Sequence, residues 1–405
     1  MKCQFTVNGR TYRPPARPVV VVCIDGSDDD YLTAALGAGR MPNVADMVQR
    51  GYRGLARGAL PSFTNVNNAC IVTGVPPNVT GITGNYFLDP DTGREVMMNS
   101  SKYLRCPTIL AAAAKAGRRV AMITAKDKLR DLLSADLRGI AFSAEKAGEA
   151  VEGTHGVGNI ESLVGQPTPD IYSADASLFV VRAGTALLER DMADFLYLSL
   201  TDYVQHGYEP AAAQSLDFYE AIDHEIGRLM DLGAVVAATA DHGMNAKTAA
   251  DGSANVIYLE TLLQHRFGTD ICVICPITDP YVAHHGSLGS LVMVHLPAGM
   301  DAGDVANWLT ELDGITEVYD RATAVRRLEL PADRIGDLVV LGGRHVVLGR
   351  TPEHHDLRQL QGRLRSHGGR CEEIVPMLIS EPLHESYAAP AGDGLRNFDV
   401  FSVIC

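Results

Sequence analysis

Several features common in secreted and membrane proteins are missing from this sequence. No apolar stretch reaches the roughly 18 residues that a membrane-spanning helix needs. The first residues, "MKCQFTVNGRTYRPPARP", contain no apolar segment of a secretory signal. The eight cysteines are scattered, and only "CVIC" has a metal-like spacing, without a second pair. We therefore expect a cytoplasmic protein with buried free thiols and no membrane partner.

Positive charge and aromatic side chains are also scarce. The chain has 35 Lys and Arg against 49 Asp and Glu, which gives a formal net charge of -14. So acidic a chain does not favour nucleic acid, because that partner requires a positive surface. Aromatic residues make up 6% of the chain, which leaves little surface for stacking a base. Any small anionic ligand must be held by local positive charge or by metal ions.

What remains is the composition of a layered α/β protein, rich in Ala, Val and Gly. At 405 residues, one large domain with an insertion, or two domains, is expected. Continuous apolar runs such as "VVVVCIDG" are typical of strands buried on both faces, and they alternate with helical segments. The pattern predicts a mainly parallel sheet sandwiched by helices.

Two regions depart from this alternation. "FTVNGRTYR" alternates around Asn-Gly, which predicts a hairpin within residues 1–16. Residues 253–335 have shorter strands and predict a smaller inserted α+β cap. The core would then comprise residues 17–252 and 336–405, and we expect "GDLVVLGG" to return to the main sheet.

Acidic and imidazole side chains follow the predicted core strands. They are Asp25, Asp202, His206, Asp241, His242 and, in the tail segment "RSHGG", His367. Taken singly, an Asp after a strand is commonly a helix N-cap, and an isolated His is commonly a hydrogen-bonded residue. Because the carboxyl ends of parallel strands line one crevice, we expect all six to converge. Converging carboxylates need neutralising cations, and six mixed Asp and His ligands suit two ions of zinc or a similar metal.

A nucleophile candidate stands at the start of the predicted helix "TNVNNACIVTG". Thr64 there is open to two interpretations. It could cap the helix, or it could be a hydroxyl at a helix N-terminus, where the dipole favours negative charge on the oxygen and on an incoming phosphoryl group. Asn85, which ends "GITGN", can donate an amide hydrogen to phosphoryl oxygens.

In order and residue type, this set resembles the alkaline phosphatase superfamily, specifically its nucleotide pyrophosphatase-like branch. The resemblance covers about residues 17–250 and 340–405 and includes "PSFTNVNNACIVTG", "TDYVQH", "ADHGM" and "RSHGG". It implies an alkaline-phosphatase-like core and two divalent ions, with Thr64 as nucleophile. The implied ligands of one zinc are Asp202, His206 and His367, and those of the other are Asp25, Thr64, Asp241 and His242.

Within that branch the sequence looks most like the phosphonoacetate hydrolase family. The resemblance implies that Lys126 and Lys128, in "TAKDKLR", bind the substrate carboxylate. Breaking a P–C bond expels a carbon leaving group, whose charge can spread onto that carboxylate, so cations there stabilise the transition state. The expected function is cleavage of phosphonoacetate, a small anion, into acetate and phosphate. Direct attack by a metal-bound hydroxide, in place of Thr64, is left open.

The alternative is a nucleotide pyrophosphatase or phosphodiesterase that uses the same metals. Tyr86, Phe87 and Tyr203 offer some surface for stacking a base. A metal-stabilised binding protein without turnover is disfavoured, because a nucleophile candidate accompanies the complete ligand set. A role for His284 or His285 of the cap in substrate contact, as opposed to loop hydrogen bonding, is left open, as is a homodimer.

Overall fold

The computed structural model describes residues 4–268, 270–279, 285–360, 363–383 and 394–405. Its largest sheet has seven strands and is mainly parallel, with one strand, β19, antiparallel to both neighbours. In spatial order the strands are β4 (Tyr52–Arg57), β19 (Ile374–Ile379), β10 (Val235–Thr239), β3 (Val19–Cys23), β9 (Phe195–Ser199), β7 (Val120–Thr124) and β8 (Ile140–Ser143).

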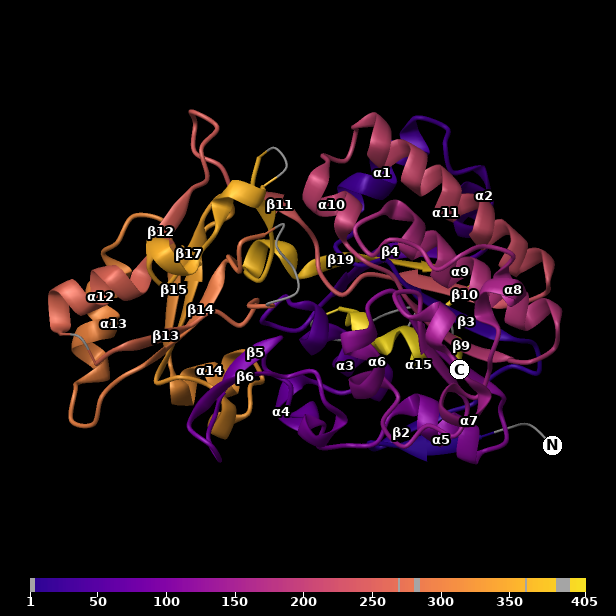
Figure 1. The fold of residues 1–405 in the computed structure, drawn as a ribbon, viewed down its shortest axis with the longest axis horizontal. Helices are drawn as coiled ribbons and strands as arrows, with labels where there is room; N and C mark the ends of the chain where they lie inside the picture. The colour runs from indigo at the N-terminus through magenta and orange to yellow at the C-terminus, as the bar shows by residue number, and fades with distance from the viewer. Residues whose placement is uncertain (1–3, 269, 280–284, 361–362, 384–393) are drawn as a thin grey trace.

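Helices cover both faces of this sheet (Figure 1). Val20 and Val22 of β3 pack into one hydrophobic layer, whereas Val19 and Val21 pack into the other, as the period of a strand requires. The first layer contains α1 (Asp29–Gly37), α2 (Pro42–Arg50), α9 (Ala174–Glu189) and α11 (Ala213–Asp231). The second contains α3 (Thr64–Thr73), α5 (Ile109–Lys115), α6 (Asp127–Leu133) and α15 (Val400–Ile404). The expected α/β sandwich is confirmed.

A smaller lobe, residues 256–349, is built on a four-stranded antiparallel sheet. Its strand order is β13 (Cys272–Ile274), β14 (Leu291–His295), β16 (Leu338–Gly342) and β15 (Ile315–Asp320). The expectation that "GDLVVLGG" returns to the main sheet is wrong, because this segment forms β16 and pairs with β14 and β15. A boundary after residue 335 therefore cuts through the smaller sheet. The helices of the lobe are α12 (Leu259–Phe267), α13 (Ala302–Thr310) and α14 (Arg321–Arg327).

Short paired strands complete the fold. The predicted N-terminal hairpin is confirmed: β1 (Phe5–Val7) pairs with β2 (Arg10–Tyr12), and Asn8 and Gly9 have φ of 50° and 77°, as a tight primed turn requires. The other pairs are β5 (Tyr86–Asp89) with β6 (Arg94–Met97), β11 (Asn245–Ala246) with β18 (Arg365–Ser366), and β12 (Val256–Tyr258) with β17 (Val347–Gly349). The remaining short helices are α4 (Pro77–Thr80), α7 (Glu152–His155), α8 (Ile160–Val164) and α10 (Tyr203–Gly207).

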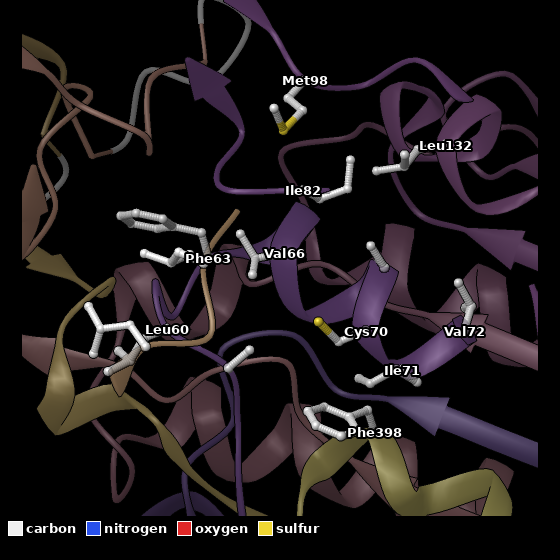
Figure 2. Close-up of a cluster of buried hydrophobic side chains, with 14 of the residues drawn as sticks. Leu60, Phe63, Val66, Cys70, Ile71, Val72, Ile82, Met98, Leu132 and Phe398 are labelled. Atoms are coloured by element: carbon white, nitrogen blue, oxygen red, sulfur yellow. The ribbon is translucent and has the colours of Figure 1, made fainter. Parts of the chain in front are cut away.

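Helix α3 is buried along its whole length. In Figure 2 its side chains Val66, Cys70 and Ile71 lie among apolar side chains from other segments, including Leu132 and Phe398. Such close packing on every side holds the N-terminus of α3 in one position. None of the helices in the described part of the chain has the length and hydrophobicity needed to cross a lipid bilayer.

Candidate active site

Three carboxylates lie at the carboxyl ends of adjacent parallel strands. Asp25 follows β3, Asp202 follows β9 and Asp241 follows β10, and each of the three is at most 2% exposed. Gly26 makes the close approach feasible, because its φ is 72° and a Cβ at this position would lie 3.0 Å from Cβ of Asp202. The predicted convergence of these carboxylates is therefore seen in the structure.

The three predicted imidazoles reach the same place, and their ring nitrogens are arranged alike. Each Nδ1 lies 2.8–2.9 Å from a backbone carbonyl oxygen, which can only accept, so Nδ1 carries a hydrogen and Nε2 is the nitrogen left to bind a metal. Such fixing of one ring nitrogen by a backbone group is typical of metal-ligating histidines. The Nε2 to carboxylate-oxygen distances are 2.9 Å for His206 to Asp202, 3.3 Å for His242 to Asp25 and 3.9 Å for His367 to Asp202.

Potential ligand atoms form two overlapping groups, within each of which all atoms lie within 4.8 Å of one another. One group is Asp202, His242 and His367, and the other is Asp25, Asp241 and His242. The His242 ring also stacks on that of His367, with centroids 3.6 Å apart. His206 adjoins the first group through Asp202. All six predicted ligands are brought together, while their division between two ions stays a prediction.

The described residues do not neutralise this much negative charge. Both carboxylate oxygens of Asp25 are buried and accept no hydrogen bond from the described residues. Burial, followed by the charges of Asp202 and Asp241, raises the pKa of Asp25 well above its usual range. Burial, with a contribution from Asp202, raises the pKa of Asp241 to about 7. Divalent cations would relieve this penalty, and the carboxylate and imidazole donors fit such ions.

Thr64 is the first residue of α3, and its hydroxyl does not cap the helix. Phe63 occupies the N-cap position without a side-chain hydrogen bond. The Oγ1 atom of Thr64 instead lies 3.3 Å from Nε2 of His242, and the residue is 5% exposed. The hydroxyl thus faces the candidate metal ligands from the positive end of a helix.

Asn85 stands beside Thr64 and is oriented by the same helix. Its Oδ1 accepts a hydrogen bond of 3.1 Å from the backbone N–H of Asn65, the second residue of α3. Its Nδ2 makes no hydrogen bond with any residue in the described ranges. The amide group that a phosphoryl oxygen would need is therefore still available.

Lys126 and Lys128 also lie at this edge of the sheet, and each has a carboxylate partner. The chain turns after β7, so that Lys126 is the N-cap residue of α6 and Lys128 lies in its first turn. Nζ of Lys126 donates to Oδ1 of Asp202 at 3.1 Å. Nζ of Lys128 pairs with Asp279, which the smaller lobe contributes. Sequence reasoning missed Asp279, because no local pattern links it to a lysine 151 residues earlier.

Burial works against positive charge on both amines. At Lys126 the charges of Asp202 and Asp25 outweigh burial and raise its pKa. At Lys128, burial and the neighbouring Lys126 lower the pKa to about 7, an effect that the charges of Asp202 and Asp25 oppose only in part. Both side chains line a cavity of about 340 Å³, whose wall also includes Thr201 and Tyr203. The carboxylates of Asp127, Glu145 and Asp279 line the cavity as well, so an anion there would approach both amines and three acidic side chains.

Of the two cap histidines, His284 lies outside the described residues. His285 is 4% exposed, and its ring centroid lies 5.5 Å from that of His206. Its Nδ1 accepts a hydrogen bond of 3.0 Å from the backbone N–H of Ser287. His285 therefore borders the site and also stabilises its own loop.

A buried ion pair that the sequence analysis did not identify joins two of the histidine-bearing segments. The side chains of Lys247 and Glu372 are both 0% exposed, with Nζ and Oε1 2.8 Å apart. Glu372 also accepts hydrogen bonds from Asn245 Nδ2 at 2.7 Å and from the backbone N–H of Gly369 at 3.0 Å. Together with the pairing of β11 and β18, these bonds fix the loop after β10 against the loop after β18.

Comparison with known proteins agrees with the family resemblance expected from the sequence. A family model described as type I phosphodiesterase / nucleotide pyrophosphatase matches residues 19–370. Among curated proteins, an uncharacterized pyrophosphatase/phosphodiesterase of Schizosaccharomyces pombe is 33% identical over 91 residues, which is 22% of this chain and 18% of that protein. The matched segment thus spans less than a fifth of that relative.

Similar solved structures cover far more of the chain. Two crystal structures of phosphonoacetate hydrolase from Sinorhizobium meliloti, in complex with phosphonoformate and with phosphonoacetate, are 46% identical, with a TM-score of 0.95 and complete coverage of both chains. Murine ectonucleotide pyrophosphatase/phosphodiesterase 5 shares the fold at 17% identity and a TM-score of 0.65, covering 96% of this chain and 94% of that one. The resemblance expected from the sequence is confirmed.

We expect the Lys247–Glu372 pair to control metal retention. The purified protein should hold about two divalent ions per chain by elemental analysis. In Glu372→Gln, which removes the charge that faces Lys247, metal affinity should fall about 10- to 100-fold, as for other groups that orient ligands. Competition with a chromophoric chelator measures this affinity without an activity assay.

Glu373→Gln is the matched control, because the neighbouring carboxylate pairs with Arg370 and does not contact Lys247. This control should retain both ions. Unchanged chelator competition in a folded Glu372→Gln protein would refute the positioning role, and one ion or none in the wild-type protein would refute the dinuclear site.

Proposed function

Because the chain belongs to the type I phosphodiesterase / nucleotide pyrophosphatase family, whose model matches residues 19–370, we propose that it hydrolyses the P–C bond of phosphonoacetate. The products are acetate and phosphate. The observation that carries this proposal is the position of Lys126 and Lys128 in one cavity, with Lys126 donating to Asp202, a candidate metal ligand. The site then offers positive charge to both ends of a molecule that has a phosphonate and a carboxylate.

The similar crystal structures favour the same substrate class. The Sinorhizobium meliloti enzyme is named phosphonoacetate hydrolase and is seen with phosphonoacetate and with phosphonoformate. Both ligands join a phosphonate to a carboxylate at short range. At 46% identity over the full length, this likeness supports a small anionic substrate for the present chain.

The proposed cofactor is a pair of divalent cations, for which the mixed Asp and His ligands favour zinc. When bound, such ions neutralise phosphoryl oxygens and lower the pKa of an oxygen nucleophile. The residues that would hold them are Asp25, Asp202, His206, Asp241, His242 and His367, with Thr64 as an added ligand through its Oγ1.

In the proposed reaction the hydroxyl of Thr64 gives its proton to solvent, its Oγ1 attacks phosphorus, and the P–C bond breaks with its electron pair passing to carbon. Acetate leaves as its enolate and takes a proton from solvent. Water then cleaves the phospho-threonine, which regenerates the hydroxyl and releases phosphate. Nδ2 of Asn85 donates to a phosphoryl oxygen, while the N-terminus of α3 favours the negative charge that develops there.

The two lysines act at the other end of the substrate. As the P–C bond breaks, negative charge spreads from carbon onto the carboxylate oxygens, so contacts with Nζ of Lys126 and Lys128 strengthen in the transition state. For this contact Lys128 must share its charge between Asp279 and the substrate. A phosphate ester has no carboxylate at this position, and its leaving oxygen needs no such help.

Lysine variants test this substrate assignment. The wild-type protein with zinc should prefer phosphonoacetate over a nucleotide phosphodiester and an aryl phosphate monoester, as measured by kcat/KM. Lys126→Ala and Lys128→Ala should each lower kcat/KM for phosphonoacetate about 100-fold, since each removes a charge-assisted contact that is strongest in the transition state. Their effect on the aryl ester should be much smaller.

Lys146→Ala is the matched control, because this lysine lines the same cavity with a side chain that is 48% exposed. It should leave all three activities near wild-type values. A preference for the nucleotide phosphodiester would overturn the proposed function in favour of a phosphodiesterase. Equal losses on all substrates in both lysine variants would count against carboxylate recognition.

A second pair of variants tests the nucleophile. Thr64→Ala should lower kcat about 1,000-fold or more, because it removes the hydroxyl that forms the covalent intermediate. Thr64→Ser keeps a hydroxyl at the helix N-terminus and should restore much of the lost rate. Mass spectrometry of acid-quenched Thr64→Ser and wild-type reactions should detect a phosphorylated residue at position 64. Full activity in Thr64→Ala would instead support direct attack by hydroxide.

A further inference from the structure

A second cavity, with an excess of positive charge, lies where the core meets the smaller lobe. Its volume is about 290 Å³, and no candidate metal ligand and neither of the lysines discussed above lines it. Five of its lining residues are arginines: Arg57, Arg326, Arg327, Arg370 and Arg396. Two glutamates, Glu329 and Glu373, also line it, so that five positive charges face two negative ones. This excess of positive charge stands out in a chain whose net charge is -14.

Three of the arginines are poorly neutralised. Nε of Arg57 is 3.8 Å from Oε1 of Glu373, too far for a hydrogen bond. Arg326 and Arg327 are exposed, and within the described ranges neither lies within 4.0 Å of a carboxylate oxygen; Arg326 donates to the hydroxyl of Thr323 at 3.2 Å, and Glu317 and Asp320 lie near enough to feel their charge. Guanidinium groups from two separate segments can therefore turn toward a ligand without first giving up a strong partner.

The other two arginines are held in place and form a fixed part of the wall. Arg370 donates from two nitrogens to Glu317, at 3.0 and 2.6 Å. Arg396 pairs with Glu329 at 2.8 Å and donates from Nε to the backbone carbonyl of Arg57 at 3.2 Å. These contacts restrict both side chains before any ligand binds, which lowers the entropic cost of binding.

Helix ends explain only part of this cluster. Arg326 and Arg327 lie in the last turn of α14, where basic residues offset the partial charge of unpaired carbonyls. Arg57 is the last residue of β4, and Arg396 precedes the short helix at Asn397–Asp399, so no helix C-terminus accounts for them. All five basic residues are arginines, whose forked donors match phosphate geometry better than lysine does.

We propose that this arginine cavity binds a small phosphoryl anion, as free phosphate or as a phosphate ester, at a site separate from the candidate metal centre. A ligand there would connect β4 of the core with α14 of the smaller lobe. Two of the lining residues are also close in sequence to candidate active-site residues. Gly58 begins the segment that leads to Thr64, and Arg370 follows His367 by three residues.

Equilibrium dialysis of the metal-loaded protein against radiolabelled inorganic phosphate tests the proposal. The double variant Arg326→Ala/Arg327→Ala should bind about one phosphate per chain fewer than the wild-type protein, because affinity at the cavity falls at least about ten-fold with the loss of two charged donors. Arg358→Ala/Arg363→Ala, which removes the same charge from exposed positions outside the cavity, should bind as the wild type does.

Two further arms complete the experiment. Glycerol 3-phosphate serves as a competitor. If it displaces the radiolabelled phosphate, the cavity accepts phosphate esters; if it does not, the cavity is specific for free phosphate. The single variant Arg326→Ala replaces the double variant if thermal unfolding shows that the latter is not folded. Equal phosphate binding by the wild-type protein and the cavity variant, or an equal loss in the charge-matched control, would overturn the proposal.

Discussion

Like charge concentrated at one edge of a parallel sheet is the constraint on which the rest of this structure depends. Asp25, Asp202 and Asp241 are buried at the ends of three neighbouring strands, where water cannot screen them. Nearby hydrogen-bond donors compensate part of this negative charge. Lys126 donates to Asp202, and Asn68 donates to Oδ2 of Asp241 at 3.1 Å. Asp25 is left without a donor among the described residues, so cation binding and stability of the fold are coupled.

Holding such a site requires a rigid frame, and packing provides it. Helix α3 is buried on every side, and Asn68 within it is fixed by hydrogen bonds from Tyr197 and Ser199 at 2.7 and 2.9 Å. The turn after His367 is equally constrained, because Gly368 has φ of 110° and a Cβ at this position would lie 2.2 Å from the ring of Phe63. Preorganised groups of this kind need little rearrangement when charge develops at a reacting atom.

The sequence predicts the parts of this site that follow from local pattern and topology. Buried strands read as continuous apolar runs, and parallel strands must bring their carboxyl ends together, so the six metal-ligand candidates could be found without coordinates. A continuous apolar run indicates that a segment is a buried strand, but it does not indicate which sheet the strand joins. For this reason the sequence-based expectation for β16 was wrong.

Ion pairs between distant segments could not be predicted from the sequence for a different reason. Glu372 lies in the polar sequence "RCEE", and a glutamate there is typically exposed, because charged residues are rarely buried unless they are paired. Its partner Lys247 lies 125 residues earlier. Such pairs depend on how distant segments pack, and composition and periodicity carry no information about that.

The pairing of β11 with β18 has a consequence for how such an enzyme can diversify. The chain leaves the core after Ala246 and returns at Arg365, and these two points are hydrogen-bonded neighbours. Residues 247–364, which contain the smaller lobe, therefore leave and rejoin the core at two adjacent points. The smaller lobe supplies Asp279 to Lys128 but none of the six metal-ligand candidates. Sequence changes within this lobe can therefore alter the partner of Lys128 while the six metal-ligand candidates, which lie in the core, are kept.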